Sequence, residues 1–235
     1  MSDFYNQYKV AEKFVSINGE GKRVGQLAVF IRFTGCNLKC KYCDTMWANN
    51  KDTPFEAMTA KQILDYILDT KVKNVTLTGG EPLLQENISQ LITMLLENNL
   101  RVEIETNGSV DILSIRKKCQ EYITKNNIIN NLTFTVDYKT SCSGMEEFMC
   151  MPNFANVDKQ DTVKFVCGSV DDLKTAKQVI EKYKLTEKCS VYLSSAFGLI
   201  SPADIVEFMK QENMNDVNLQ LQMHKFIWDP KAKGV

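Results

Sequence analysis

The sequence predicts an α/β fold, with a parallel sheet covered by helices in a single domain over residues 1–235. Short apolar, β-branched runs alternate with segments of helical periodicity, a pattern that is typical of βα units. The chain has 235 residues, 44% of them hydrophobic and 24% charged, which is enough for one sizeable core. The sequence shows no repeats, low-complexity tracts or linkers, so a second domain is not expected.

Each expected element follows from its local pattern. Strands are expected at residues 27–33, 74–78, 101–105, 132–137, 163–167, 190–193 and 218–223. Helices are expected at residues 59–70, 88–98, 112–124, 170–183 and 202–212. The first helix carries apolar residues at helical spacing from Ile63 to Leu68, and Thr59 is suited to cap it. Right-handed crossovers curl such a sheet and bring the C-terminal strand ends to one active face.

One connection departs from this alternation. Between Tyr138 and Thr162 the chain carries small and turn-forming residues, including Ser143-Gly144 and Met151-Pro152-Asn153, but no long helical pattern. A connection of this length without a helix predicts a long functional loop in place of a crossover helix.

The net charge and the cysteine pattern limit the kinds of binding partner and the cellular compartment that we expect. The net charge is -1, which gives no electrostatic footprint for nucleic acid or an anionic membrane. The N-terminus lacks the pattern of a signal peptide, and no segment is long and apolar enough to span a bilayer. Eight cysteines without regular spacing fit a reducing compartment, so we expect a cytoplasmic protein. Five of them are scattered and expected to be buried structural thiols: Cys119, Cys142, Cys150, Cys167 and Cys189.

Cys36, Cys40 and Cys43 are the most informative residues of the chain. Their spacing, Cys-x3-Cys-x2-Cys, lets three thiolates hold three corners of a four-iron cluster and leaves the fourth iron open to a small molecule. A structural zinc site is the alternative, but it wants four ligands, and the next cysteine and the only histidine are distant. A disulfide is the other alternative, but a disulfide between two of these three cysteines would leave the third unpaired.

Two glycine-containing loops follow successive strands. Thr78-Gly79-Gly80-Glu81-Pro82 lets the backbone approach a ligand closely, and Glu81 offers an acceptor for an ammonium group. Glu105-Thr106-Asn107-Gly108 ends the next strand, and Asp137 with Lys139 ends the one after it. The alternatives are ordinary glycine-rich or Asn-Gly turns and a solvated ion pair.

Arg32 is a charged residue in an otherwise apolar strand, so it is costly to bury unless it is paired. A guanidinium there suits a bidentate grip on a ligand carboxylate. The alternative is a structural pair with Glu20. The glycines around Glu20 predict backbone packed against a flat ligand.

The C-terminal run 217–224 alternates. Val217, Leu219, Leu221 and Met223 are expected to face the helices, and Asn218, Gln220, Gln222 and His224 the interior of the sheet. Burying such a polar face costs free energy unless its side chains form hydrogen bonds to a ligand or to water. His224 is either a hydrogen-bonded core histidine or, beside Gln222 and Lys225, a substrate contact.

The cysteine spacing, with Tyr42 before the third cysteine, and the Gly79-Gly80-Glu81-Pro82 element resemble the radical S-adenosylmethionine (radical SAM) superfamily. Together, five elements along the chain resemble the 7-carboxy-7-deazaguanine synthase family. They are Glu12-x3-Ser16-x2-Gly19-Glu20-Gly21-x3-Gly25, Phe30-x-Arg32-x2-Gly35-Cys36-Asn37-Leu38-x-Cys40-x2-Cys43-Asp44-Thr45, Thr78-Gly79-Gly80-Glu81-Pro82, Glu105-Thr106-Asn107-Gly108 and Gln222-x-His224-Lys225.

This resemblance implies a shortened, distorted partial (βα) TIM barrel of the radical SAM type. It implies that 6-carboxy-5,6,7,8-tetrahydropterin is converted to 7-carboxy-7-deazaguanine and ammonia, in the biosynthesis of queuosine and other 7-deazapurines. A reduced [4Fe–4S] cluster would cleave S-adenosyl-L-methionine to a radical that takes a hydrogen from the substrate, and Mg2+ would assist. The resemblance also implies a homodimer, and a flavodoxin- or ferredoxin-like protein is expected as electron donor.

The resemblance also implies roles for individual residues. Cluster ligands would be Cys36, Cys40 and Cys43, and Thr45 would be the protein ligand of Mg2+. The cofactor would be contacted by Tyr42, Cys43, Asp44, Gly80, Glu81, Asn107, Lys139 and Ser194. The substrate would be contacted by Ile17, Asn18, Gly19, Glu20, Arg32, Thr78, Gln222 and His224. His224 is also the one candidate for a direct catalytic part.

Two alternatives remain at this point. A glycyl-radical-enzyme activase would use the same cofactors on a partner protein, but it has no need of Glu20 and Arg32 for a small carboxylated substrate. A non-catalytic iron–sulfur protein leaves Arg32 and the polar last strand without a purpose. The tail beyond Trp228, residues 229–235, has no counterpart in the resemblance.

Overall fold

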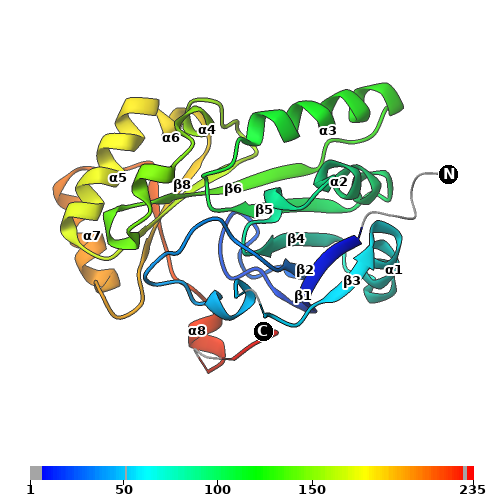
Figure 1. The fold of residues 1–235 in the computed structure, drawn as a ribbon. Coiled ribbons are helices and arrows are strands. Elements are labelled where there is room, and N and C mark those ends of the chain that lie inside the picture. The colour runs from blue at the N-terminus through cyan, green and yellow to red at the C-terminus, as the bar shows by residue number, and fades with distance from the viewer. Residues whose placement is uncertain (1–6, 51, 230–231) are drawn as a thin grey trace.

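The computed structural model describes residues 7–50, 52–229 and 232–235. Within these residues nine strands form one sheet, in the order β3-β1-β2-β4-β5-β6-β7-β8-β9 (Figure 1). The strands are β1 (Gln7–Ile17), β2 (Leu27–Phe33), β3 (Glu56–Thr59), β4 (Asn74–Gly79), β5 (Arg101–Thr106), β6 (Leu132–Lys139), β7 (Thr162–Cys167), β8 (Ser190–Ser195) and β9 (Val217–Gln220). The helices are α1 (Ala60–Thr70), α2 (Ile88–Glu97), α3 (Ile112–Asn126), α4 (Met151–Ala155), α5 (Val170–Tyr183), α6 (Leu185–Lys188), α7 (Pro202–Gln211) and α8 (His224–Ile227).

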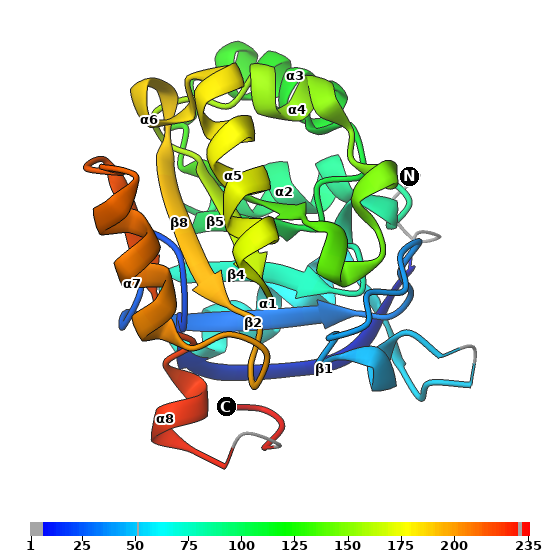
Figure 2. The same cartoon turned by 90° about the vertical axis from the view of Figure 1, so that its left-hand side faces the viewer.

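The sheet is curled and mostly parallel. Strands β2 and β4 to β9 run parallel to one another, while β1 pairs antiparallel with both β2 and β3. The long helices lie on the outer face of the curl, with α8 and the C-terminus at one end (Figure 2). Strands β3 and β9 form the two edges, so the barrel is incomplete. The prediction of an α/β partial barrel is confirmed, and a single domain over residues 1–235 stays a prediction.

The edge strand β9 is tied to the β1–β2 turn across this opening. Gln220 accepts a hydrogen bond from the amide of Gly21 at 2.9 Å, and its own amide donates to the Gly21 carbonyl at 3.4 Å. Both contacts are buried, and they join residues far apart in sequence. The inward-facing Gln220 therefore holds the β1–β2 turn against the other end of the sheet.

Most expected elements are present with small shifts at their ends. All seven expected strands and all five expected helices appear, and Thr59 caps α1 in a reciprocal pair with Gln62. Strands β1 and β3 were not expected. The register of β1 shifts between Val10 and Glu12, which interrupts the two-residue period that identifies a strand. Strand β3 has only four residues.

The expectation of a strand over residues 218–223 is wrong in its second half. Strand β9 ends at Gln220, and Leu221 is 41% exposed instead of packed against the helices. Gln222 and His224 thus reach the interior from a turn and from the start of α8. The alternation of apolar and polar residues continues to residue 224 and predicts a longer strand. The strand ends earlier because β9 pairs with β8 only over residues 217–220.

The long connection between β6 and β7 holds two single 3-10 turns and the five-residue helix α4. The prediction that this connection has no long crossover helix is confirmed for the described residues. The buried Asn153 in α4 donates to the carbonyls of Gly108 and Val110 and accepts from the Ile112 amide. The segment therefore supports the loop after β5, where Asn107 lies. Among the helices that the structure describes, none combines the length and apolar character needed to cross a membrane.

Alternation along the central strands separates the core from the interior of the curl. In β4 to β7 one set of side chains is apolar and fully buried, for example Leu77, Ile104 and Phe165. The alternating set is polar, and its members Thr78, Glu105, Thr135, Asp137 and Lys164 line a common cavity. The inside of this barrel is thus a charged surface, and its side chains need partners or a ligand.

Candidate active site

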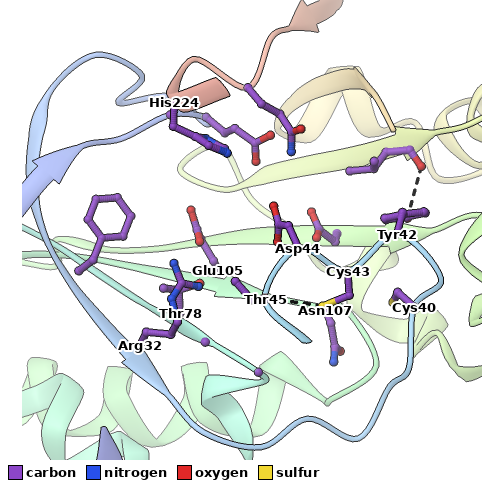
Figure 3. Close-up of a pocket in the computed structure, with 18 of the residues that line it drawn as sticks. Arg32, Cys40, Tyr42, Cys43, Asp44, Thr45, Thr78, Glu105, Asn107 and His224 are labelled. Carbon is purple, nitrogen blue, oxygen red and sulfur yellow. Dashed lines mark hydrogen bonds between the residues drawn. The ribbon is translucent and has the colours of Figure 1, made fainter. Parts of the chain in front are cut away.

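A cavity of about 620 Å³ lies at the C-terminal ends of the strands. Its walls come from β1, β2, the central strands, the cysteine loop, α8 and residues 232–235. Figure 3 shows that Cys40, Cys43 and Tyr42 lie toward one end, while Arg32 lies toward the other. We call these the cysteine end and the arginine end. His224 lies on the side of the arginine end, across the cavity from Arg32.

At the cysteine end, the loop after β2 brings all three predicted cluster cysteines to the cavity wall. Gly35, with φ +86°, turns the chain out of β2 before Cys36, and a tight turn from the Cys43 amide to the Cys40 carbonyl closes the loop. The Lys41 amide donates to Ser143 in the β6–β7 connection. The loop is therefore fixed on both sides by backbone contacts.

Polar groups surround the cysteine sulfurs. Cys36 Sγ accepts from the Leu38 amide at 3.4 Å and from Asn107 Nδ2 at 3.5 Å. Cys43 Sγ lies 3.6 Å from the Thr45 hydroxyl and accepts from Asn49 Nδ2 at 3.9 Å. Donors of this kind stabilise iron-bound thiolates. The donor set therefore fits a thiolate-ligated iron–sulfur cluster.

Burial raises the pKa of the Cys36 and Cys40 thiols, and the nearby Cys43 adds to the rise at both. Cys36 and Cys40 thus resist losing their protons until a cationic metal group binds them. Within residues 7–50, 52–229 and 232–235, no group of three His, Cys, Asp or Glu side chains converges on one metal ion. A four-iron cubane bonds each cysteine to a different iron, so its ligands need not meet at one point.

The two glycines after β4 are required by the backbone of the cysteine loop. A Cβ on Gly80 would lie 1.8 Å from the Gly35 carbonyl oxygen, and one on Gly79 would lie 2.3 Å from that of Phe33. The Gly80 and Glu81 amides donate to these same carbonyls of Phe33 and Gly35. Both glycines also line the cavity, but the close approach that excludes a side chain is to protein backbone.

Glu81 is fully buried and does not line the cavity. Its carboxylate accepts from the Leu83 amide at 3.1 Å, the Thr106 hydroxyl at 2.9 Å and the Asn107 amide at 2.7 Å. Burial raises its pKa to about 7, although the hydrogen bonds from these three donors favour the charged form. Glu81 therefore joins the loop after β4 to the loop after β5 and places Asn107 beside Cys36.

At the arginine end, Arg32 Nε donates to Glu12 Oε1 at 2.7 Å. The alternative of an Arg32–Glu20 pair is therefore wrong, because Glu12 on the neighbouring β1 is the partner and both side chains are largely buried. The remaining guanidinium nitrogens are left for the cavity that Arg32 lines. Phe14 stacks on Phe30 beside it, with ring centroids 5.0 Å apart and planes within 4°.

Four charged side chains run between the two ends. Glu20 pairs with Lys164, Lys164 lies 3.2 Å from Asp137, and Asp137 accepts from Lys139 at 2.6 Å. Burial lowers the pKa of the Lys164 ammonium, but the surrounding carboxylates of Asp137, Glu20 and Glu105 raise it well above its usual value. Asp137 likewise raises the pKa of Lys139, so both lysines stay charged, and acidic and basic side chains alternate along this chain of four.

Glu105 faces the cavity at the end of β5, next to this chain. Burial raises its pKa to about 7, although Lys164 and a hydrogen bond from Thr78 favour the charged form. A carboxyl group with this pKa exchanges a proton near neutral pH. Glu105 was not among the predicted site residues.

His224 begins α8 and lies against the β1–β2 turn. A Cβ on Gly19 would lie 3.1 Å from His224 Nδ1, so a side chain there would press on the imidazole. Burial lowers the pKa of His224 below its usual value, which favours the neutral ring. The adjacent Lys225 lies 4.0 Å from Asp44 and over the ring of Phe197. Helix α8 thus closes one side of the cavity by contacts with the cysteine loop.

The structure brings most of the predicted site residues into this one cavity. Those that line it are Ile17, Gly19, Glu20, Arg32, Cys36, Cys40, Tyr42, Cys43, Asp44, Thr45, Thr78, Gly80, Asn107, Lys139, Gln222 and His224. Asn18, Glu81 and Ser194 do not line it. Asn18 accepts from the Thr76 hydroxyl at 2.8 Å. The hydroxyl of the fully buried Ser194 has no hydrogen-bond partner in residues 7–50, 52–229 and 232–235.

Other lining residues had been given no individual role: Glu12 and Glu105 stand only within motifs of the resemblance, and Phe14 and Lys164 were not singled out. Lys164 and Glu105 are charged residues inside expected strands, the same signal that drew attention to Arg32. Residues 232–235 also line the cavity, and Lys233 lies 4.1 Å from the centre of the Trp47 ring. No sequence pattern indicated that contact.

Comparisons of sequence find close relatives over nearly the whole chain. A profile of the radical SAM superfamily matches residues 30–138. The chain is 54% identical over 229 residues to the 7-carboxy-7-deazaguanine synthase of Clostridium acetobutylicum, covering 97% of this chain and 99% of the relative. It is 33% identical over 229 residues to the protein of that name from Chlorobaculum tepidum, covering 96% of each.

Comparisons of structure find the same fold. QueE from Escherichia coli matches with a TM-score of 0.70 at 22% identity, over 94% of this chain and 98% of that one. Streptococcus suis SuiB bound to S-adenosylmethionine matches with a TM-score of 0.57 at 16% identity, over 80% of this chain and 48% of that one. These likenesses show a partial barrel of the radical SAM type.

Replacing Cys36, Cys40 or Cys43 by Ala should abolish assembly of an iron–sulfur cluster, because each thiolate would hold a separate iron. The measurement is iron and acid-labile sulfide per chain after anaerobic reconstitution. Cys119→Ala is the matched control, since Cys119 is fully buried in the core and away from the cavity. Normal iron content in any of the first three variants, or zinc uptake without iron in the wild type, contradicts the prediction.

Replacing Glu105 by Gln should remove a pH dependence of stability between about pH 4.5 and pH 7. The folded protein keeps a proton on Glu105 up to about 7, whereas the unfolded chain releases it near 4.5. The free energy of unfolding of the wild type therefore falls as pH rises through this window. In Glu105→Gln the part of this fall that comes from Glu105 is absent. Urea unfolding at about pH 5 and about pH 8 measures the difference.

The exposed Glu121→Gln on α3 serves as the control, because its carboxylate lies outside the cavity. Glu81 remains in every variant, so its own titration cancels from the comparison. Wild-type and Glu105→Gln curves that stay parallel across the window would refute the raised pKa.

Proposed function

The chain belongs to the 7-carboxy-7-deazaguanine synthase family and is a radical SAM carbon–nitrogen lyase of queuosine biosynthesis, and we propose how its cavity divides between cofactors and substrate. We infer that the cysteine end binds a [4Fe–4S] cluster and S-adenosyl-L-methionine. The arginine end binds 6-carboxy-5,6,7,8-tetrahydropterin. The observation that supports this division is one continuous cavity with a thiol-lined end and a cationic, aromatic end.

The cysteine end suits the cluster and the polar methionine part of the cofactor. Cys36, Cys40 and Cys43 would hold the cluster, which, when bound and reduced, supplies an electron that cleaves S-adenosyl-L-methionine. Backbone at Gly80 and side chains of Asp44, Asn107 and Lys139 offer hydrogen bonds around that position. Contacts from Glu81 and Ser194 stay predictions, since neither side chain lines the cavity.

The arginine end suits a flat, carboxylated heterocycle. Arg32 has guanidinium nitrogens free of Glu12, and these can grip the substrate carboxylate in two-pronged fashion. The stacked pair of Phe14 and Phe30 offers an aromatic wall to the pterin ring. Glu20 has one oxygen, Oε1, that is buried and finds no hydrogen-bond partner within the described part of the chain, and an N–H donor of the pterin would satisfy it.

Residues of this chain can also handle protons during ring contraction. Loss of ammonia requires a proton at the departing nitrogen, and the Glu105 carboxyl group holds one up to a pH of about 7. His224 is biased to its neutral form on the opposite wall, where it can accept or donate a hydrogen bond. The rest of the protein positions the substrate and keeps solvent away from the cavity.

We propose that the Thr45 hydroxyl would hold Mg2+, which when bound would supply positive charge for the substrate carboxylate. Thr45 precedes a short 3-10 turn, but its side chain makes no capping hydrogen bond there. Its hydroxyl lies by Cys43 Sγ and faces the cavity, so a structural capping role has no support. One hydroxyl oxygen suits Mg2+, which keeps most of its ligands as water and substrate oxygens.

The homodimer, the flavodoxin- or ferredoxin-like electron donor and the cytoplasmic location stay predictions. Family membership decides against the two earlier alternatives, an activase of a glycyl-radical enzyme and a non-catalytic iron–sulfur protein. The direct test of the proposed chemistry uses reconstituted protein with a reductant, S-adenosyl-L-methionine and the carboxytetrahydropterin. We expect 7-carboxy-7-deazaguanine and ammonia in equal amounts. Cofactor cleavage without either product overturns the proposed substrate.

Arg32→Lys should weaken substrate binding by about 2–5 kcal/mol and leave S-adenosyl-L-methionine binding nearly unchanged. Lysine keeps the charge but cannot pair with Glu12 and also grip a carboxylate in two places. Equilibrium binding of each ligand separates the effects. Arg101→Lys, at the opposite end of its strand from the cavity, is the control. Selective loss of cofactor affinity in Arg32→Lys would mean that the two ends are assigned the wrong way round.

Thr45→Ala should lower turnover and the response to added Mg2+ while the cluster and cofactor affinity remain intact. The change removes the only protein ligand proposed for the ion, and water can replace it only in part. Mg2+ titration against turnover, in wild type and variant, measures this. Thr53→Ala is the matched control, because Thr53 is a buried neighbour that donates to the Trp47 carbonyl at 2.7 Å. Identical metal dependence in wild type and Thr45→Ala removes Thr45 from the site.

A further inference from the structure

We propose that Lys164 is a positioning residue that orients Glu20 toward the substrate and links it, through Asp137, to Lys139 at the cofactor end. The inference rests on the proposed function, because it presumes that Glu20 meets the pterin. Neither the sequence motifs nor the family resemblance drew attention to Lys164.

Lys164 occupies the middle of β7 and points into the cavity, with only 8% of the residue exposed. The strand residues around it, Val163, Phe165 and Cys167, are fully buried and apolar. Burying an ammonium in such a place is costly unless carboxylates surround it. Its partners come from two other elements, the β1–β2 turn and the end of β6.

The two oxygens of Glu20 have different environments. Oε2 accepts a hydrogen bond from Lys164, whereas Oε1 is buried and has no hydrogen-bond partner among the residues that the structure describes. A buried oxygen in that state calls for a donor from a ligand, because leaving it without a hydrogen bond costs free energy. By holding Oε2, Lys164 fixes the plane of the carboxylate and so the direction in which Oε1 faces.

On its other side, Lys164 lies 3.2 Å from Asp137, which accepts from Lys139 at 2.6 Å. Asp137 is thus shared by a cation on the substrate side and a cation on the cofactor side. Burial raises the pKa of Asp137, but the two lysines together hold it below its usual value. Removing the Lys164 charge would leave Glu20 without its cation and Asp137 with only Lys139.

A purely structural ion pair is the competing explanation, and the chain contains a matched example. Arg116 bridges Asp158 and Asp161, with 2.5 Å contacts to both, and Asp161 is fully buried. Like Lys164, Arg116 is one cation between two carboxylates. Unlike Lys164, it lies outside the cavity. Replacing Arg116 therefore measures the free energy of unfolding that is lost when such a bridge is broken at a place where no ligand binds.

The test measures the affinity of the reconstituted holoenzyme for 6-carboxy-5,6,7,8-tetrahydropterin by anaerobic calorimetry. S-adenosyl-L-methionine is present and the reductant is omitted, so no turnover occurs. We expect Lys164→Met to weaken pterin binding about 10- to 100-fold, with cofactor affinity within about 3-fold of wild type. Glu20→Gln should have a loss of similar size, since the two residues act as one unit.

The double variant, Lys164→Met with Glu20→Gln, should bind the pterin no more than about 3-fold worse than the weaker single variant. Lys164→Arg should lose less than Lys164→Met, because it keeps the charge. It also carries the test if Lys164→Met fails to fold, with about a 3- to 10-fold loss expected. Arg116→Met should lower the unfolding midpoint and leave pterin affinity unchanged.

Losses that multiply in the double variant show that Lys164 does not act through Glu20, and they overturn the proposal. So does Lys164→Met with wild-type pterin affinity and only a lowered unfolding midpoint. An equal fall in cofactor and pterin affinity overturns it as well. A wild-type holoenzyme that does not bind the pterin overturns the proposed function itself and this inference with it, a result distinct from the other three.

Discussion

The interior of the curled sheet is charged, and the need to pair those charges shapes the site. Glu20, Lys164, Asp137 and Lys139 form an alternating chain from the arginine end to the cysteine end, and Arg32 is held by Glu12. Asp137 and Lys139 both lie on β6, but every other pair joins different strands or loops, so the electrostatic requirement of burial also fixes the geometry of the walls. Among the described residues one oxygen of Glu20 remains buried and unpaired, and the proposed place of a ligand donor rests on it.

Much of the fold was predictable from local pattern. Strand β2, helix α1 with its Thr59 cap and the missing crossover after β6 all followed from periodicity and turn residues. Strand β1 was missed because a register shift breaks its alternation, and the last strand was drawn too long because alternation continues after its partner ends. The cysteines and Arg32 were found from spacing and from charge in an apolar strand. The actual partner of Arg32 depends on β1, which sequence reasoning had not placed.

The glycines after β4 had been attributed to close approach of a ligand, and the structure adds a more immediate cause. Gly79 and Gly80 lie against backbone carbonyls of Phe33 and Gly35, immediately before the first cysteine. Glu81 then binds the loop that carries Asn107, whose amide donates to Cys36 Sγ. Three loops from three different strands are thereby locked into one arrangement around the thiols. Sequence could place these motifs at one end of the sheet but could not show that they hold one another.

That interlocking has a consequence for building chimaeras between relatives. A segment carrying the three cysteines cannot be exchanged alone, because its carbonyls at Phe33 and Gly35 must meet a partner that lacks side chains. The transplantable unit is discontinuous: the cysteine loop, the Gly79–Glu81 turn and the Asn107 loop must travel together. The run between Cys36 and Cys40 belongs to the same unit, because Asn37 accepts from the Asn107 side-chain amide and donates to the Ser109 hydroxyl, and Leu38 is buried in the core.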